Sequence, residues 1–244
     1  MKMVKSQDEK KLTILGLCGG NTPIVAENAY DSLGVTAFDI IKNIDVPEPS
    51  YPYLFEGFNF EIFNSDTYRY VSKTIGVHFG VLDAHIKYIL FHYFRNKLEI
   101  SKLSYVNLIH STAFKAVSAE HGNGLLMGPQ SVIATFSKIG FGVTVKRSAS
   151  VGHHARLGDF VSINPGAVLS GFVEVGEGTT IATGASVVHN VTIGKHTLIG
   201  AGSVVTKDIP DGVIAYGNPC KVIRKNERWI SAEKRLKTMV EALK

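Results

Sequence analysis

Two adjacent histidines, His153 and His154, are the residues of this chain best suited to acid–base chemistry. They occupy the third and fourth positions of a six-residue repeat that Val151 opens. This placement predicts side chains at a bend that point away from the interior, because the aliphatic position of each repeat fills the interior. Since histidine is largely neutral at cellular pH, an outward imidazole can take a proton from a reacting group. The pair is the first candidate for a catalytic site.

A glycine-bearing turn is the second candidate, and it consists of Gly16-Leu-Cys-Gly-Gly-Asn21. It follows a predicted strand and opens a predicted helix, where backbone N–H groups and the helix dipole favour phosphate. Asp39 lies at about the twenty-residue distance that is usual for a ribose-binding acid. Cys18, however, stands where the dinucleotide fingerprint has its middle glycine. The alternative interpretation is therefore a purely structural turn with a solvated Asp39.

The elements that position the histidines come from an internal repeat of six residues. An aliphatic residue recurs at every sixth position from Ile133 to Val205 without a gap. With 45% of the chain hydrophobic, such a run would arise by chance with a probability of roughly three in a hundred thousand. The repeat predicts a β-helix from about Met127 to Val205, whose interior holds the following aliphatics: Ile133, Ile139, Val145, Val151, Leu157, Ile163, Leu169, Val175, Ile181, Val187, Ile193, Ile199 and Val205.

Two other positions of the repeat are also regular. The residue after the aliphatic is often glycine, as at Gly152 and Gly176, which we interpret as backbone freedom for tight corners. Four positions after the aliphatic comes a small or β-branched residue, as at Ala149 and Ala167, which would pack beside the aliphatic in a narrow interior. Burying one large aliphatic side chain contributes roughly 1.5–3 kcal/mol, so the stack explains how very short strands hold together.

The residues before the repeats alternate between strand and helix patterns, which predicts a small parallel α/β domain. The expected strands are 11–17, 35–41, 60–63, 75–79 and 105–110, and the expected helices are 22–32, 67–73 and 82–97. After the repeats we expect a strand at 213–216, a turn at 217–221 and a terminal helix at 228–243 that caps the coil or a neighbouring chain. The expected divisions are a flexible tail at 1–10, the α/β domain at 11–110, the β-helix at 111–210 and the C-terminal strand and helix at 211–244.

Composition and charge restrict the classes of function. The formal net charge of +5 is not gathered into a basic block, so it fits small anionic ligands and does not favour nucleic acid. The two cysteines, Cys18 and Cys220, predict no disulfide framework and fit a reducing cytoplasm. The first residues lack the apolar core of a signal peptide, and the apolar run 88–94 is too short to span a bilayer. We therefore expect a cytoplasmic protein without a membrane partner.

Several motifs resemble those of a known family. The segments 199–210 and 217–219 resemble bacterial left-handed β-helix acetyltransferases, and the segments 108–110, 151–160 and 165–171 narrow the likeness. The whole is similar to sugar acetyltransferases that modify nucleotide-linked amino sugars or sialic acid. The resemblance implies a Rossmann-like N-terminal domain, a left-handed coil, a homotrimer with active sites between subunits, and acetyl-CoA as co-substrate in a groove between coils.

The resemblance also implies roles for residues of the catalytic corner. His153 aligns with the family's catalytic base, which takes a proton from the acceptor while the acceptor attacks the thioester. The family has an acidic residue after the base, whereas this chain has His154, so either another carboxylate substitutes or the base is weaker. Gly171 is the expected backbone donor to the oxyanion, with corner geometry alone as its alternative role. A weaker base favours an amine acceptor over a sugar hydroxyl.

Further roles are implied for the two substrates. Ser162 stands where relatives often have a histidine that contacts the coenzyme. Coenzyme contacts are expected at Ser162, Thr183, Ala201, Gly202 and Lys207, with Lys207 near a phosphate. The nucleotide-linked sugar is expected at Gly16, Gly19, Gly20, Asn21 and Asp39.

The leading hypothesis is acetyl transfer from acetyl-CoA to the amino group of a nucleotide-linked amino deoxysugar. One alternative is O-acetylation of sialic acid or another sugar hydroxyl, and another is a catalytically inactive scaffold that binds a nucleotide sugar. A zinc enzyme is a third, because His153 and His189 occupy the same corner. They are two coils, or roughly 10 Å, apart in one chain, which is too far to share one ion without other ligands, so no metal is expected.

Overall fold

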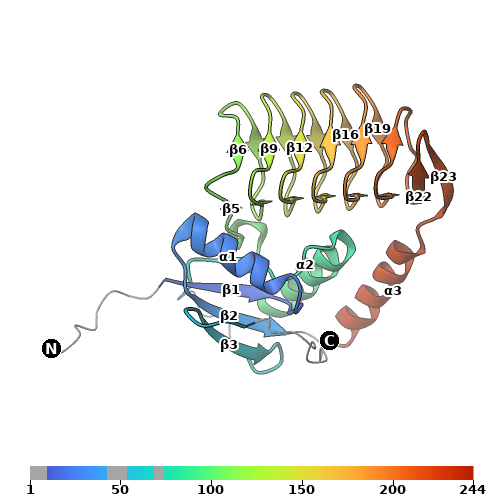
Figure 1. The fold of residues 1–244 in the computed structure, drawn as a ribbon. Coiled ribbons are helices and arrows are strands. Elements are labelled where there is room, and N and C mark those ends of the chain that lie inside the picture. The colour runs from blue at the N-terminus through green and yellow to red at the C-terminus, as the bar shows by residue number, and fades with distance from the viewer. Residues whose placement is uncertain (1–9, 43–53, 69–73, 244) are drawn as a thin grey trace.

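The computed structural model describes residues 10–42, 54–68 and 74–243. In this part of the chain an α/β domain lies against one side of a long parallel β-helix (Figure 1). A C-terminal helix runs from the far end of the β-helix back toward the α/β domain. The predicted fold class, a parallel α/β domain followed by a β-helix and a terminal helix, is confirmed.

The sheet of the α/β domain is parallel, with the strand order β3-β2-β1-β4. Its strands are β1 (Lys11–Leu15), β2 (Ala37–Lys42), β3 (Asn59–Asn64) and β4 (Val77–Phe79), and its helices are α1 (Thr22–Leu33) and α2 (Ala84–Leu98). A short 3-10 helix, η1 (Lys102–Ser104), leads out of the domain. The predicted helix at 67–73 lies largely outside the described residues.

The two helices cover opposite faces of this sheet because alternate strand residues point to opposite sides. Leu12 and Phe38 pack with α1, whereas Leu15 and Ile41 pack with α2. The α1 helix has a proline in its first turn and ends at Gly34, which has a left-handed φ of 70°. Both helices also touch the β-helix, so the domain is fixed against the coil.

The β-helix has three sheets, here called sheets I, II and III, which follow one another along the chain. Val145 pairs with Ile163, eighteen positions further on, so three hexapeptides make one coil. Sheet I holds β5 (Leu108–Ile109), β8 (Leu126–Met127), β11 (Thr144–Val145), β14 (Ser162–Ile163), β17 (Thr180–Ile181), β20 (Leu198–Ile199), β22 (Val213–Gly217) and β23 (Cys220–Lys225). Sheet II holds β6 (Phe114–Lys115), β9 (Val132–Ile133), β12 (Ser150–Val151), β15 (Val168–Leu169), β18 (Ser186–Val187) and β21 (Val204–Val205). Sheet III holds β7 (Glu120–His121), β10 (Lys138–Ile139), β13 (Arg156–Leu157), β16 (Glu174–Val175) and β19 (Thr192–Ile193).

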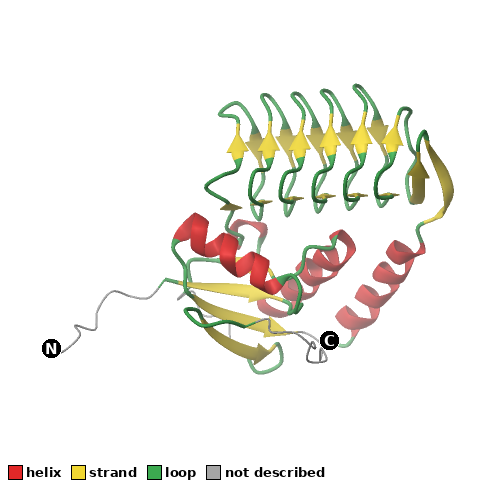
Figure 2. Cartoon of the chain, viewed as in Figure 1, coloured by secondary structure: helices red, strands yellow, loops and turns green. Residues whose placement is uncertain are grey.

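The interior of the coil is the predicted double row of apolar residues. Ile163 and Ile181 are fully buried, and so are the small residues Ala149 and Ala167. They belong to one continuous apolar cluster that runs along the coil. The short strands alternate with loops at the bends, which we name corners I–II, II–III and III–I after the sheets that they join (Figure 2).

The glycines after the aliphatic residues were predicted to supply backbone freedom for the corners, and this explanation was wrong. The left-handed backbone lies two residues later, three positions after the aliphatic, as at Phe136, His154 and Phe172, whose φ values are 58°, 59° and 59°. A Cβ at Gly152 would instead lie 2.5 Å from the backbone of Ser170 in the next coil. Glycine is needed there because neighbouring coils approach closely, not because of its φ.

The first coil begins earlier than the repeat pattern indicated. The expected strand at 105–110 was wrong as the last strand of the α/β sheet, because Leu108 pairs with Leu126 in sheet I. The start of this stretch still meets the α/β sheet at β4, where Tyr105 forms an isolated bridge to Val77 and Val106 N donates to the Val77 carbonyl at 3.0 Å. The aliphatic period is irregular in this stretch, which hid the first coils.

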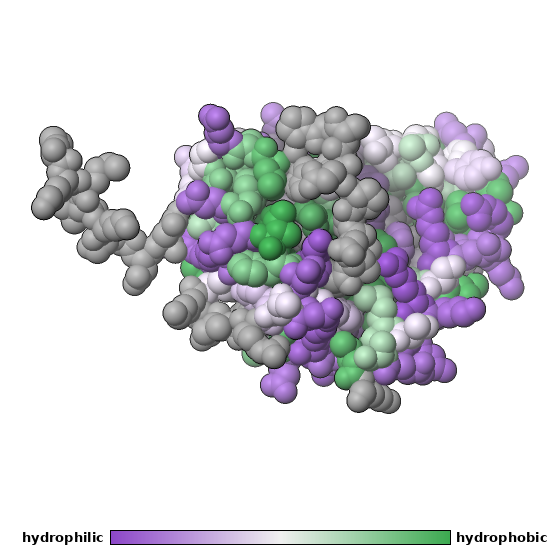
Figure 3. All heavy atoms as spheres, turned by 90° about the horizontal axis from the view of Figure 1, so that it is seen from below, coloured by the Kyte–Doolittle hydropathy of each residue, from purple (hydrophilic) through white to green (hydrophobic). Residues whose placement is uncertain are grey.

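The C-terminal segment closes the coil with a hairpin, of which the sequence predicted the first strand and the turn but not the second strand. β22 continues sheet I and β23 pairs with β22 in antiparallel orientation. The helix α3 (Glu227–Glu241) then packs against α2 and buries Trp229. None of the helices in the described ranges is long and apolar enough to cross a membrane. Seen from below, hydrophobic side chains gather over part of the outer surface of the α/β domain (Figure 3).

Candidate active site

His153 and His154 lie at corner II–III, directly after β12, and both side chains are exposed. The positive φ of His154 bends the chain at this corner. The two rings are nearly perpendicular, and His153 Nδ1 lies 3.1 Å from His154 Nδ1. The structure thus brings the two predicted residues into direct hydrogen-bond contact, with one face of His153 open to a substrate.

Gly171 lies one coil beyond His153 and beneath its ring. A Cβ at Gly171 would lie 2.5 Å from His153 Nε2, so any larger residue would displace the imidazole. Phe172 N donates to the His153 carbonyl at 2.9 Å, whereas the N–H of Gly171 makes no hydrogen bond within the described chain. A free backbone donor beside an exposed imidazole is the arrangement that an oxyanion would need.

An aromatic column, which sequence reasoning missed, runs along the same corner. We call the residues Phe136, His154, Phe172 and Asn190 the corner column, because they repeat every eighteen positions at a left-handed φ. His154 stacks on Phe172 with centroids 4.7 Å apart and an angle of 7°, and Phe136 lies 5.1 Å from its ring in the preceding coil. The eighteen-residue spacing of two phenylalanines around a histidine could have predicted this column.

A hollow of about 300 Å³ lies beside the corner column, on the side of sheet III. Its walls include His154 together with Lys138, Arg156 and Glu174. Arg156 Nε and a Glu174 carboxylate oxygen are 3.7 Å apart. The carboxylate in the walls of this hollow is therefore already paired with a cation. Asp159, an acid six positions after His153, lies at corner III–I, where it pairs with Lys102 and accepts from Phe141 N.

The predicted coenzyme residues fall on two different corners. Thr183, Ala201 and Gly202 are exposed at corner I–II, where Gly202 N donates to the Thr183 carbonyl at 2.9 Å. Lys207 is exposed at corner II–III, in register with His153 and three coils further along. At about 4.8 Å per coil, Lys207 stands about 14 Å from the histidine. Within one chain, the width of sheet II separates the two groups.

Ser162 is not accessible in the single chain. It is 1% exposed, and its hydroxyl donates to the Leu82 carbonyl at 2.9 Å, where the α/β domain meets sheet I. The structure thus gives Ser162 a role in packing, and its contact with a coenzyme stays a prediction.

The glycine-bearing turn leads from β1 into α1 as predicted. Gly16 has a φ of 84° and its N–H donates to the Ile41 carbonyl, which fixes the turn at the end of the sheet. The Thr22 hydroxyl accepts from Cys18 N and donates to the Gly80 carbonyl. Gly19, Gly20 and Asn21 lie in this turn and are only partly covered or exposed. The turn is therefore ordered by its own hydrogen bonds and open at the start of α1.

Asp39 lies inside β2 and not at the carboxyl end of the strand. Its carboxylate is 2.6 Å from Lys11 Nζ and accepts from the Tyr68 hydroxyl at 3.1 Å. The side chain is 11% exposed. Since its partners come from the protein, its contact with a ribose stays a prediction.

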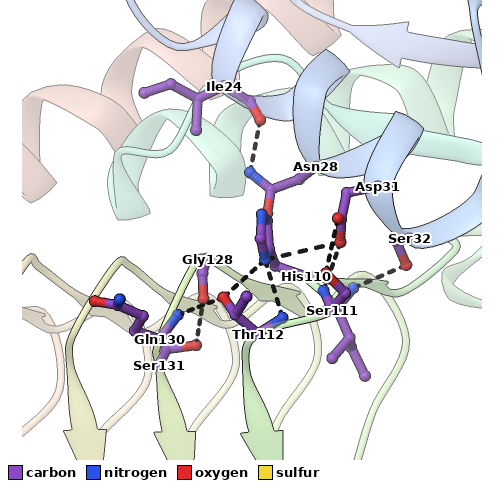
Figure 4. A network of polar contacts seen from close by, with 11 residues as sticks. Ile24, Asn28, Asp31, Ser32, His110, Ser111, Thr112, Gly128, Gln130 and Ser131 are labelled. Atoms are coloured by element: carbon purple, nitrogen blue, oxygen red, sulfur yellow. Dashed lines mark hydrogen bonds and ion pairs between the residues drawn. The ribbon is translucent and has the colours of Figure 1, made fainter.

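A polar network fixes α1 to corner I–II (Figure 4). Asp31 accepts from the Ser111 N–H and hydroxyl, and Ser32 accepts from Ile109 N. His110 Nδ1 lies 2.9 Å from the Thr112 hydroxyl, which also accepts from Gln130 N. The network joins the α/β domain to the first coils, and sequence reasoning did not find it because its members lie about eighty positions apart.

The described residues contain no group of three histidine, cysteine or acidic side chains that could hold a metal ion. The ring of Phe172 contacts both His153 and His189, at 5.2 Å and 5.3 Å between centroids. Within the chain, the ring of Phe172 therefore lies in contact with both His153 and His189.

Comparisons with known proteins agree with this fold. Residues 172–207 match the family described as bacterial transferase hexapeptide (six repeats). No curated protein sequence matches the chain. The acetyltransferase domain of PglB from Neisseria gonorrhoeae is 30% identical, with a TM-score of 0.73, 88% of this chain covered and 100% of that one.

Two further solved structures contain ligands. The same PglB domain in complex with acetyl coenzyme A is 28% identical, with a TM-score of 0.72 and coverage of 88% and 100%. PerB from Caulobacter crescentus, in complex with CoA and GDP-perosamine, is 27% identical, with a TM-score of 0.69 and coverage of 88% and 97%. The chain therefore belongs to the left-handed β-helix sugar acetyltransferases that are built from hexapeptide repeats.

Proposed function

We propose that this chain transfers an acetyl group from acetyl-CoA to the amino group of a nucleotide-linked amino deoxysugar, with His153 as the general base. The observation that carries the proposal is the exposed His153 imidazole seated over Gly171 at corner II–III. The bound acetyl coenzyme A of the PglB domain and the bound CoA and GDP-perosamine of PerB support the two substrate classes.

The chemistry assigned to the corner is acyl transfer through a tetrahedral intermediate. The amine nitrogen attacks the thioester carbonyl carbon and forms the C–N bond, while the carbonyl electron pair moves to the oxygen. His153 Nε2 takes a proton from that nitrogen, and the free N–H of Gly171 donates to the oxyanion. The electron pair of the oxyanion then re-forms the carbonyl as the C–S bond breaks. The departing thiolate takes the proton from the imidazolium.

A homotrimer with its active sites between subunits would explain why the coenzyme residues lie on two corners. In a ring of identical subunits, corner II–III of one chain can face corner I–II of the next, which would place His153 and Lys207 opposite Thr183 and Ala201 of a neighbour. Apolar side chains are exposed along sheet II and its corners, as surfaces for such contacts: Phe114, Val117, Phe136, Val168, Phe172 and Val188.

We assign the acceptor's nucleotide to the turn at Gly16–Asn21, because it opens α1 with exposed backbone at the helix start.

We place the reaction in the cytoplasm, since Cys18 and Cys220 are both free thiols.

The test is thiol release from acetyl-CoA with UDP-, dTDP- and GDP-linked amino sugars and with sialic acid. Turnover with an amino sugar, and its loss by at least about a hundredfold in His153→Ala, is the expected result. Equilibrium binding of CoA to the variant controls for folding. Unchanged turnover would exclude His153 as the base, turnover with sialic acid alone would favour O-acetylation, and binding without turnover would favour an inactive scaffold.

A further inference from the structure

The geometry points to His154 as a positioning residue that fixes which ring nitrogen of His153 holds the proton. This inference rests on the proposed function, because it concerns the base of that reaction. It departs from a carboxylate partner in one respect: His154 supplies a neutral hydrogen-bond acceptor and no negative charge.

The 3.1 Å contact between the two Nδ1 atoms allows two proton arrangements. A neutral imidazole has one N–H and one lone pair, so one ring must donate through Nδ1 and the other must accept there. If His154 donates, the proton of His153 sits on Nε2, and the ring cannot act as a base through that atom. If His153 donates, its Nε2 lone pair is free on the side of Gly171, where the acceptor amine would stand. Only the second arrangement is productive.

The corner column holds the His154 ring in the plane that this bond requires. Phe172 stacks on it at 7°, and Phe136 contacts it from the preceding coil. Phe172 also meets the His153 ring edge-on at 90°, with centroids 5.2 Å apart. The two phenylalanines therefore fix the orientation of both imidazoles. Little conformational entropy is then lost when the proton is transferred.

The surroundings of His154 explain why it acts as a neutral acceptor. The charged groups in the walls of its hollow are Lys138, Arg156 and Glu174, and Glu174 is paired with Arg156. Among the described residues, the side-chain hydrogen bond that either histidine makes is the one to the other ring, and no carboxylate takes part. When His153 takes the substrate proton on Nε2, its Nδ1–H stays on the lone pair of His154, and no proton passes to His154.

Two substitutions at His154 separate its role as a hydrogen-bond acceptor from its ring stacking. The corner column itself shows that the backbone tolerates both, since Phe172 has a φ of 59° and Asn190 a φ of 63°. His154→Phe keeps the stack and removes the acceptor, whereas His154→Asn keeps a carbonyl acceptor and removes the aromatic ring. We expect His154→Phe to lower kcat about tenfold to a hundredfold with KM unchanged, and His154→Asn to stay within about threefold of the parent.

Full activity in His154→Phe, or equal losses in both variants with a lowered Tm, would overturn the inference. A second measurement does not need a substrate: ¹⁵N NMR of histidine-labelled protein should show His153 protonated at Nδ1 and His154 at Nε2. The reverse assignment would refute the positioning role. Failure of the proposed function is distinguishable, because it would appear as unchanged turnover in His153→Ala or as no turnover of any amino sugar.

Discussion

Two corners of the coil use the same repeat position for different purposes. His154 at corner II–III and His196 at corner III–I both lie three positions after a buried aliphatic, with φ values of 59° and 57°. Each ring is stacked nearly parallel on an aromatic residue, His154 on Phe172 at 4.7 Å and His196 on Trp229 at 4.0 Å. The local structures are alike, so the difference in role comes from what lies above each corner.

Corner III–I is covered and corner II–III is not. The α/β domain covers Gly142 and Phe160, and α3 covers Gly178 and His196. Burial lowers the pKa of His196, which favours its neutral form. His153 and His154 remain exposed. A histidine of this repeat is thus available for chemistry where no second element covers it, and it is a packing residue where one does.

The largest expected effect comes from Lys87, which reaches from α2 to the covered corner. The residue is 1% exposed, and its ammonium donates to the Gly142 carbonyl at 2.6 Å and the Thr144 hydroxyl at 2.9 Å. Burial, reinforced by the charge of Lys146 and opposed by Asp83, lowers the pKa of Lys87 to about 7. In the unfolded chain it titrates near 10.5, so above pH 7 the unfolded chain holds a proton that the folded chain releases.

The contribution of Lys87 to stability therefore rises with pH from 7 toward 10.5 and is flat below 7. In Lys87→Met this dependence is lost. The free energy of unfolding of the parent, relative to that of the variant, should therefore rise by about 2 kcal/mol from pH 7 to pH 9. Urea unfolding at the two pH values measures it, with the exposed Lys234→Met as the control. A difference that does not change with pH would show that Lys87 is charged at both values.

The open corner could be predicted from the sequence and the covered one could not. The hexapeptide period places Val151 inside and His153 outside without further information, because it depends only on local spacing. The stacking of His154 between two phenylalanines follows from the same period, once eighteen residues are recognised as one coil. These parts of the site depend on contacts that recur at a fixed separation along the chain.

The covered corner depends on contacts between segments with no common period. Nothing in the spacing predicts that Ser162 would donate to Leu82, or that α3 would return to place Trp229 on His196. Asp39 fits a ribose-binding acid by its distance along the chain, yet Lys11 and Tyr68 are its partners in the fold. The position of the α/β domain on sheet I thus decides which predicted residues stay accessible.

An effect of similar size is expected from a covered and an uncovered glycine of the coil. Gly178 and Gly184 share a φ of 67°, so an alanine is strained equally at both. A Cβ at Gly178 would overlap with the Trp229 ring, whereas no atom lies within 4 Å of one at Gly184. Gly178→Ala should therefore destabilise the protein by about 2 kcal/mol more than Gly184→Ala, as measured by denaturant unfolding. Equal losses would mean that α3 does not pack on this corner in solution.

The smallest effects on stability, and the most direct test of the comparison, come from replacing each stacked histidine by alanine. His196→Ala removes the stack on Trp229 and should lower the free energy of unfolding by about 1 kcal/mol, with kcat unchanged. His154→Ala should lower kcat, with a smaller effect on stability because its ring is exposed.

A double-mutant cycle with Trp229→Ala isolates the stacking between Trp229 and His196, and a coupling of about 1 kcal/mol is expected. A coupling energy near zero would show that Trp229 and His196 do not stack in solution. A loss of kcat in His196→Ala as large as that in His154→Ala would show that the two corners are not separated in function. In that case α3 would have to transmit its packing to the active site, because His196 and His154 lie at different corners of the coil.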